Sequence, residues 1–226
     1  MSDVIGPVDE VLLGFDVRVV PAEASALWDV QRRARFLLAP GVPGPLSVDV
    51  IVWPSLFDWG QGAGMTPSER GRLRLAGLAP PVWTGANAGL WDDLDAMRAY
   101  LRARWGDGAL PRHTVVALTW VMDPTSVARR RAGGPYARPT TPPTVATAWT
   151  RVGYDVADAS RLSGLTNCGY ERDEAPPLRE RWGRFLNVHH VFDQIAYALA
   201  FRQAADIRVS EHAPFFVYGL YVIEDA

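Results

Sequence analysis

The chain has 226 residues, a formal net charge of −2 and 48% hydrophobic residues, which is typical of a globular protein and excludes an intrinsically disordered one. This charge gives no long-range attraction for nucleic acid, whose binding depends on clustered cationic side chains, so a nucleic-acid partner is disfavoured. All 23 basic side chains are arginine, which excludes a Walker phosphate loop, a Schiff-base lysine and a lysine general base.

The amino-terminal stretch begins acidic, at Asp3, and lacks the basic segment and apolar core of a signal peptide. No apolar run reaches the roughly 20 residues that span a bilayer. A single cysteine, Cys168, excludes an intrachain disulfide and fits a reducing compartment. We therefore expect a cytoplasmic protein that does not bind membranes.

The first third of the chain predicts two strands and two helices. Residues 11–20 alternate between apolar and polar side chains, as in a half-buried strand, and 22–39 have the three- and four-residue spacing of an amphipathic helix. Residues 47–53 predict a second strand. A second helix begins at a capping box, in which Thr66 and Glu69 exchange hydrogen bonds with each other's backbone amides.

The middle of the chain predicts a helix, a buried strand and a loop. Apolar residues at helical spacing predict a helix over 90–101, and the almost continuously apolar segment 113–122 predicts a strand covered on both faces, which we expect to be central. A short helix follows Asp123. Residues 132–143 are rich in proline and glycine and predict a mobile loop.

The last third predicts further strands at 144–152 and 215–223, and the second of these is so apolar that it should lie in the interior. Three helices are predicted between them, over 155–165, 178–187 and 188–205. About five strands and six or so helices on a central sheet indicate an α+β (mixed α/β) fold. We expect residues 1–226 to form one domain, with a boundary inside the loop at 132–143 as the alternative. We find no internal repeat in the sequence.

Cys168 is the first candidate for catalysis. His189 and His190 follow it along the chain, and either imidazole could ionise the thiol if the fold brings them together, as a thiolate nucleophile requires. The simpler interpretation is that Cys168 is a small buried apolar residue.

A metal site is the second candidate. On the predicted helix, His189 and Asp193 would share one face, so a metal ion could bridge them. The sequence offers no further ligands in a compact pattern, so we expect no metal. Two glycine-rich segments, 60–64 and 85–89, do not match the dinucleotide fingerprint, so we expect no cofactor.

Asp155 and Asp158 form a third candidate, because two carboxylates three residues apart on a first helical turn could divide acid and base roles. The competing interpretation is that they favourably meet the positive end of the helix dipole.

An aromatic cluster is the candidate binding feature. Trp53, Phe57 and Trp59 lie in a loop-like segment between a proline and a run of glycines, where burying all three is difficult. If two of them are exposed, they form a contact surface suited to a protein partner or an apolar ligand. Packing across a sheet edge is the alternative.

Together these features predict a protein that binds another macromolecule through an aromatic contact surface, as an immunity-type protein or a regulatory adaptor. A protein partner is therefore expected. The alternative is a hydrolase or transferase that uses Cys168 with His189 or His190, or the Asp155 and Asp158 pair.

Overall fold

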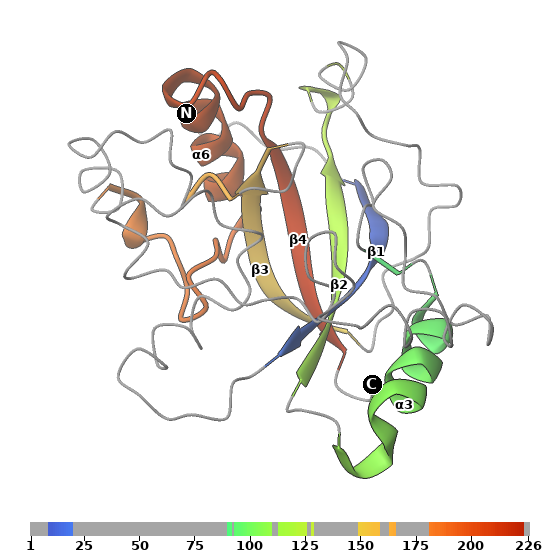
Figure 1. Cartoon of the computed structure of the whole chain (residues 1–226). Helices are drawn as coiled ribbons and strands as arrows, with labels where there is room; N and C mark the ends of the chain where they lie inside the picture. The colour runs from blue at the N-terminus through green and yellow to red at the C-terminus, as the bar shows by residue number, and fades with distance from the viewer. Residues whose placement is uncertain are drawn as a thin grey trace.

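Four antiparallel strands form one sheet in the computed structural model (Figure 1). The structure describes residues 9–19, 90–91, 93–109, 113–125, 128, 149–158, 163–165 and 181–223. The strands are β1 (Asp9–Val19), β2 (His113–Met122), β3 (Thr150–Ala157) and β4 (Phe216–Ile223), in the order β1-β2-β4-β3. Two long helices, α3 (Leu94–Ala109) and α6 (Ile195–Arg208), each lie between an edge strand and an inner strand in the sequence.

The predicted fold class of about five strands and six helices is wrong. The described part of the chain has one sheet of four strands, the helices α3 and α6, and short helical stretches at 124–125 and 181–183. The predicted elements at 22–39, at 47–53 and after Thr66, and the loop at 132–143, lie outside the described residues.

Two predicted helices fail for local reasons. Residues 155–165 were expected to be helical, but β3 runs to Ala157, and its side chains are buried on both faces from Val152 onward, which hides the alternation of a strand. The helix expected over 188–205 begins only at Ile195. Before it, the Asn187 side chain accepts hydrogen bonds from the backbone N–H groups of His189 (2.9 Å) and Val191 (3.4 Å) and holds a turn.

The predictions for the inner strands are confirmed. The segment expected to be central is β2, one of the two inner strands, and the terminal strand β4 is buried along nearly its whole length. Burial on both faces requires the unbroken apolar runs that the sequence shows in both strands.

The two edge strands share a pattern of glycine, aromatic residue, aspartate and valine, at Gly14 to Val17 in β1 and at Gly153 to Val156 in β3. Both glycines have a positive φ, +152° and +151°, and the strand register shifts directly before each of them. In both strands the buried aspartate accepts a hydrogen bond through Oδ1 from the N–H of the following valine, at 2.8 Å. The two halves of the chain therefore begin with the same local structure.

The correspondence continues into the helices. Phe15 exchanges two backbone hydrogen bonds with Trp91, and Tyr154 exchanges two with Phe192. Trp91 lies three residues before the first residue of α3, and Phe192 lies three residues before the first residue of α6. Met97 and Tyr100 of α3 pack against one half of the sheet, and Ala198 and Phe201, at the corresponding positions of α6, pack against the other.

The inner strands complete the repeat. Leu118 of β2 lies opposite Gly14, and Leu220 of β4 lies opposite Gly153. Because β2 and β4 pair antiparallel at the centre of the sheet, a half-turn about an axis between them exchanges the two halves. The two halves are therefore related as a structural repeat, which the sequence analysis did not detect. The segment from Val19 to Leu94 is much longer than the one from Ala157 to Ile195, so the sequence shows no constant period.

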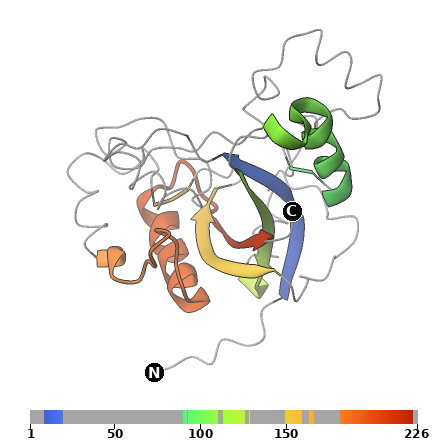
Figure 2. The ribbon, with the colours of Figure 1, turned by 90° about the horizontal axis from the view of Figure 1, so that it is seen from below.

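Both helices cover the same face of the curved sheet, α3 over β1 and β2 and α6 over β3 and β4 (Figure 2). The opposite face carries a separate apolar cluster that includes Leu13 and Leu90 from one half and their counterparts Val152 and Val191 from the other. Between the two helix-covered clusters, near the axis, lies a patch of the sheet that bears polar side chains.

Candidate functional site

Several predicted site residues lie outside the described residues. These are Trp53, Phe57, Trp59 and Cys168. The aromatic contact surface and the thiol nucleophile therefore stay predictions.

Asp155 and Asp158 do not share a helical turn. Asp155 is a buried residue of β3 that accepts hydrogen bonds from the Ser163 hydroxyl and the Val156 amide, both at 2.8 Å. Asp158 follows the strand, and its Oδ2 lies 3.0 Å from Nδ1 of His212. Each carboxylate has its own partner, so the geometry does not support the expected division of acid and base roles.

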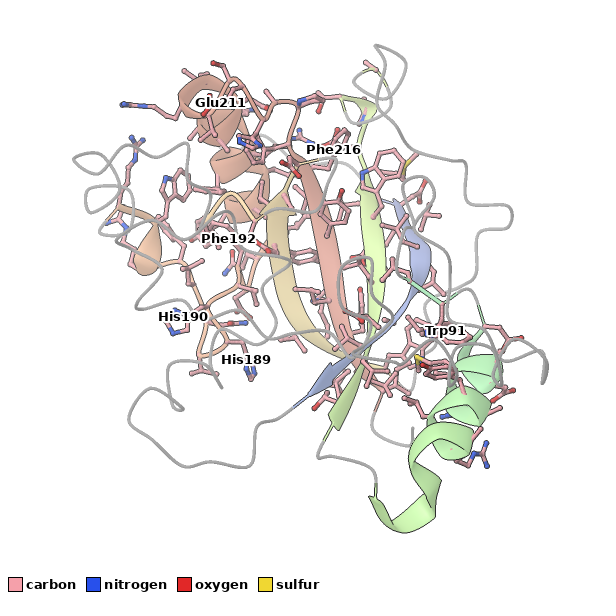
Figure 3. All side chains as sticks on the ribbon, in the orientation of Figure 1. Trp91, His189, His190, Phe192, Glu211 and Phe216 are labelled. Atoms are coloured by element: carbon pink, nitrogen blue, oxygen red, sulfur yellow. The ribbon has the colours of Figure 1, made fainter. Side chains whose placement is uncertain are left out.

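His189 and His190 lie on the turn outside β3, whereas Phe192 lies against the sheet (Figure 3). His190 is exposed and has a φ of +59°. Because the helix begins after Asp193, the expected placement of His189 and Asp193 on one helical face is wrong. Within the described ranges, no group of three or more His, Cys, Asp or Glu residues could hold a metal ion.

Two exposed arginines lie over aromatic rings on the outer side of α6. The Cζ atom of Arg181 is 5.7 Å from the centroid of the Trp182 ring, and that of Arg184 is 4.7 Å from the centroid of the Phe185 ring. A guanidinium that rests on an aromatic face is attracted by the ring quadrupole and keeps its N–H groups directed outward. The two charges are therefore held in place before any partner arrives.

The rings beneath these arginines are anchored in the core. Trp182 is 7% exposed and meets the rings of Phe192 and Phe201 edge-on, at centroid distances of 6.1 and 5.4 Å. Phe185 is half-buried and lies 4.2 Å from the Tyr197 ring. We call Arg181, Arg184 and these supporting rings, Trp182, Phe185 and Tyr197, the arginine–aromatic surface.

A second polar arrangement surrounds the carboxylate of Glu10 near the axis of the repeat. Thr119 and Tyr221 donate their hydroxyl hydrogens to Oε2, both at 2.7 Å, and Tyr154 donates to Oε1 at 3.1 Å. Nη1 of Arg151 donates to the Tyr154 oxygen at 2.8 Å. The four strands of the sheet thus all contribute to one network, which we call the Glu10 network.

The absence of a side chain at Gly219 makes room for the Glu10 network. A Cβ atom there would approach the Thr119 hydroxyl and would lie 2.6 Å from Oε2 of Glu10. Glycine at this strand position therefore lets the carboxylate and the hydroxyl meet above the backbone.

The pKa values in the Glu10 network exclude a tyrosinate at neutral pH. Burial, reinforced by the Glu10 carboxylate, raises the pKa of Tyr154 to about 12. Burial and the hydrogen bond to Glu10 also raise the pKa of Tyr221. Burial opposes the charge of Arg151, but the two tyrosines and Glu10 outweigh it and raise its pKa. The network therefore holds neutral hydroxyls between a cation and a carboxylate.

These shifts predict an alkaline loss of stability. Tyr154 ionises near pH 10 when unfolded and near pH 12 when folded, so above pH 10 the unfolded chain releases a proton that the native protein keeps. The free energy of unfolding should fall as pH rises from 10 toward 12. Urea denaturation at several pH values measures this, and Tyr154→Phe should show a shallower fall. Equal slopes for the two proteins would contradict the shift.

Comparison with known proteins gives no family for this chain. No protein-family model, curated protein or solved structure matches it. Within the part of the chain that the structure describes, no helix is long and apolar enough to cross a membrane.

Sequence reasoning missed both arrangements. The alternation of arginine and aromatic residues from Arg181 to Phe185 was a usable signal, because each arginine directly precedes the ring that supports it. The Glu10 network carries no comparable signal, since Glu10 meets Tyr154 and Tyr221 from positions 144 and 211 residues away.

Proposed function

We propose that the protein binds an acidic segment of a protein partner through the arginine–aromatic surface. The observation that carries the proposal is that Arg181 and Arg184 are exposed and each rests on an aromatic ring tied into the core. Arginine, tryptophan and tyrosine are the residues most enriched at the energetic centres of protein interfaces. An immunity-type protein and a regulatory adaptor would both act by such binding.

The charges favour a carboxylate-bearing partner. Guanidinium groups recognise carboxylates through paired hydrogen bonds, and arginines fixed in advance lose less conformational entropy when they bind. With a net charge of −2, the chain as a whole does not attract nucleic acid. A local cationic surface on a near-neutral protein is suited to an acidic protein segment instead.

The geometry gives less support to the enzymatic alternative. Asp155 and Asp158 are each engaged with a separate partner. His189 and His190 lie on an outer turn, and Cys168 lies outside the described residues.

The proposal predicts that the double variant R181A/R184A loses the partner. Wild type, this variant and R102A would be immobilised and exposed to native lysate at low salt. Arg102 is an exposed arginine of α3 that donates to a backbone carbonyl, and it is the matched control. We expect one protein to be retained by wild type and R102A, released as salt rises, and absent from the double variant.

Each lost arginine–ring contact is worth about 0.5–1 kcal/mol at an exposed site, so the double variant should fold. Thermal denaturation checks this. Equal retention of the same protein by R181A/R184A would contradict the proposal. Loss of the retained species after nuclease treatment would contradict it too, because the partner would then be a nucleic acid.

A further inference from the structure

The internal repeat provides a control for the Glu10 network, because each polar residue contributed by the edge strands has an apolar counterpart in the other half. Tyr154 follows Gly153 as Phe15 follows Gly14, and Arg151 precedes Gly153 by two residues as Leu12 precedes Gly14. Leu12 is buried in the apolar cluster beneath α3.

The counterpart of Glu10 is Trp149, since each lies four residues before its glycine. Trp149 packs its ring edge-on to Phe15 at 5.7 Å and also meets the Tyr221 ring at 6.4 Å. Glu10 contacts the equivalent partners, Tyr154 and Thr119, with hydrogen bonds in place of ring contacts. One half of the sheet thus forms with apolar residues at these positions, which indicates that the fold itself does not require the polar set of the other half.

The hydrogen bonds of the Glu10 network have a fixed direction. A carboxylate only accepts, so the Tyr154 hydroxyl must donate to Glu10 and can accept from Arg151. The Tyr154 ring also supports the guanidinium, with Cζ of Arg151 5.3 Å from its centroid. Glu10 therefore orients Tyr154, and Tyr154 holds Arg151.

Arg151 has unused binding capacity. It is exposed, and among the residues that the structure describes its guanidinium donates to the Tyr154 hydroxyl and forms no salt bridge. A guanidinium carries five N–H donors, and its planar arrangement fits two oxygens of a carboxylate or phosphate group. Tyr154 therefore positions the cation through one of its five N–H donors.

We propose that Arg151, held by Tyr154 and Glu10, is the centre of a binding site for an oxyanion group, either the carboxylate or the phosphate of a small molecule. Arg151 contacts the anion directly, and Tyr154 and Glu10 are positioning residues. Glu10 makes no direct contact with the guanidinium in the described residues, and its oxygens accept from three hydroxyl groups of the protein. This site is independent of the arginine–aromatic surface.

The test titrates the full-length protein with sodium phosphate or, separately, with sodium acetate, at constant ionic strength maintained with chloride. Binding is followed through the Nε–H signal of Arg151 in nitrogen-15 NMR spectra and through the thermal midpoint. We expect one of these anions to give a saturable response. A response to phosphate alone assigns a phosphoryl ligand, and a response to acetate assigns a carboxylate ligand.

Three variants locate the site. R151L introduces the residue found in the other half and should weaken anion binding about tenfold or more, as expected when a hydrogen bond to a charged group is lost. Y154F keeps the ring, as Phe15 does, and should weaken binding less while broadening the Arg151 Nε–H signal. R102A should bind as wild type does.

If R151L fails to fold, R151K provides the same test, because lysine keeps the charge and loses the planar pair of donors. The absence of a saturable response to either anion in wild type would overturn the proposal. An unchanged affinity in R151L, or in R151K where that variant is used, would overturn it too.

Discussion

Gly153→Ala is expected to destabilise the protein by about 2–5 kcal/mol, because the substitution combines backbone strain with overpacking. Gly153 has a φ of +151°, which side chains with a Cβ rarely adopt. A Cβ there would lie 2.6 Å from Cγ2 of Val191 and 2.7 Å from the carbonyl oxygen of Phe192. Urea denaturation should show a lower midpoint with an unchanged slope.

The chain contains both a replicate and a control for this prediction. Gly14→Ala should cost a similar amount, since its Cβ would meet the Trp91 carbonyl oxygen at 2.7 Å and Cβ of Leu90 at 2.8 Å. Gly183→Ala should change stability by less than about 1 kcal/mol, because no atom lies within 4 Å of its added Cβ. A wild-type midpoint for Gly153→Ala would show that the edge strand does not need its glycine.

Asp123→Ala should cost about 3–5 kcal/mol, the usual effect of removing one partner of a buried ion pair. Nη1 of Arg202 lies 2.7 Å from Oδ2 of Asp123, and Nη2 donates to the Thr125 hydroxyl at 2.6 Å. Both members of the ion pair are buried. The contact ties α6 to the end of β2, so its loss should also lower the thermal midpoint.

The repeat suggests how to recover this stability. Leu101 is the counterpart of Arg202 and is buried in the first half. The double variant D123A/R202L should regain much of the loss, because an apolar replacement of a buried ion pair is often neutral or stabilising. A double-mutant cycle measures the coupling.

Arg98→Ala is the matched control, since its ion pair with Asp95 is exposed and should contribute little. If the loss of unfolding free energy in D123A/R202L equalled the sum of the losses in D123A and in R202L, the two residues would not be coupled.

The sequence predicted the two inner strands. The apolar runs of β2 and β4 predicted interior strands, because an inner strand with both faces covered needs apolar side chains throughout. β3 was misjudged because its burial on both faces from Val152 onward hides the alternation of a strand, and the acidic pair at Asp155 and Asp158 resembled the start of a helix.

The candidate sites depend on contacts between distant parts of the chain. Glu10 and Trp149 are recognised as counterparts only after β1 and β3 are placed on opposite edges of one sheet. The local alternation of arginine and aromatic residues near Arg181 was visible in the sequence, but only the packing of Trp182 against Phe201 shows that one of these rings is fixed. The sequence shows which residue types lie near each other along the chain, whereas only the folded structure shows which side chains are held in place by packing.

The backbone hydrogen bonds that Phe15 and Tyr154 exchange with Trp91 and Phe192 also limit how this protein can associate. An edge strand with open amide and carbonyl groups invites a neighbouring molecule to extend the sheet, which is a common route to aggregation. Here Trp91 and Phe192 occupy those groups on the two edges, and the carboxylates of Asp16 and Asp155 accept from the amides of the valines that follow them. At these positions the molecule is protected against growing into a fibril by adding strands.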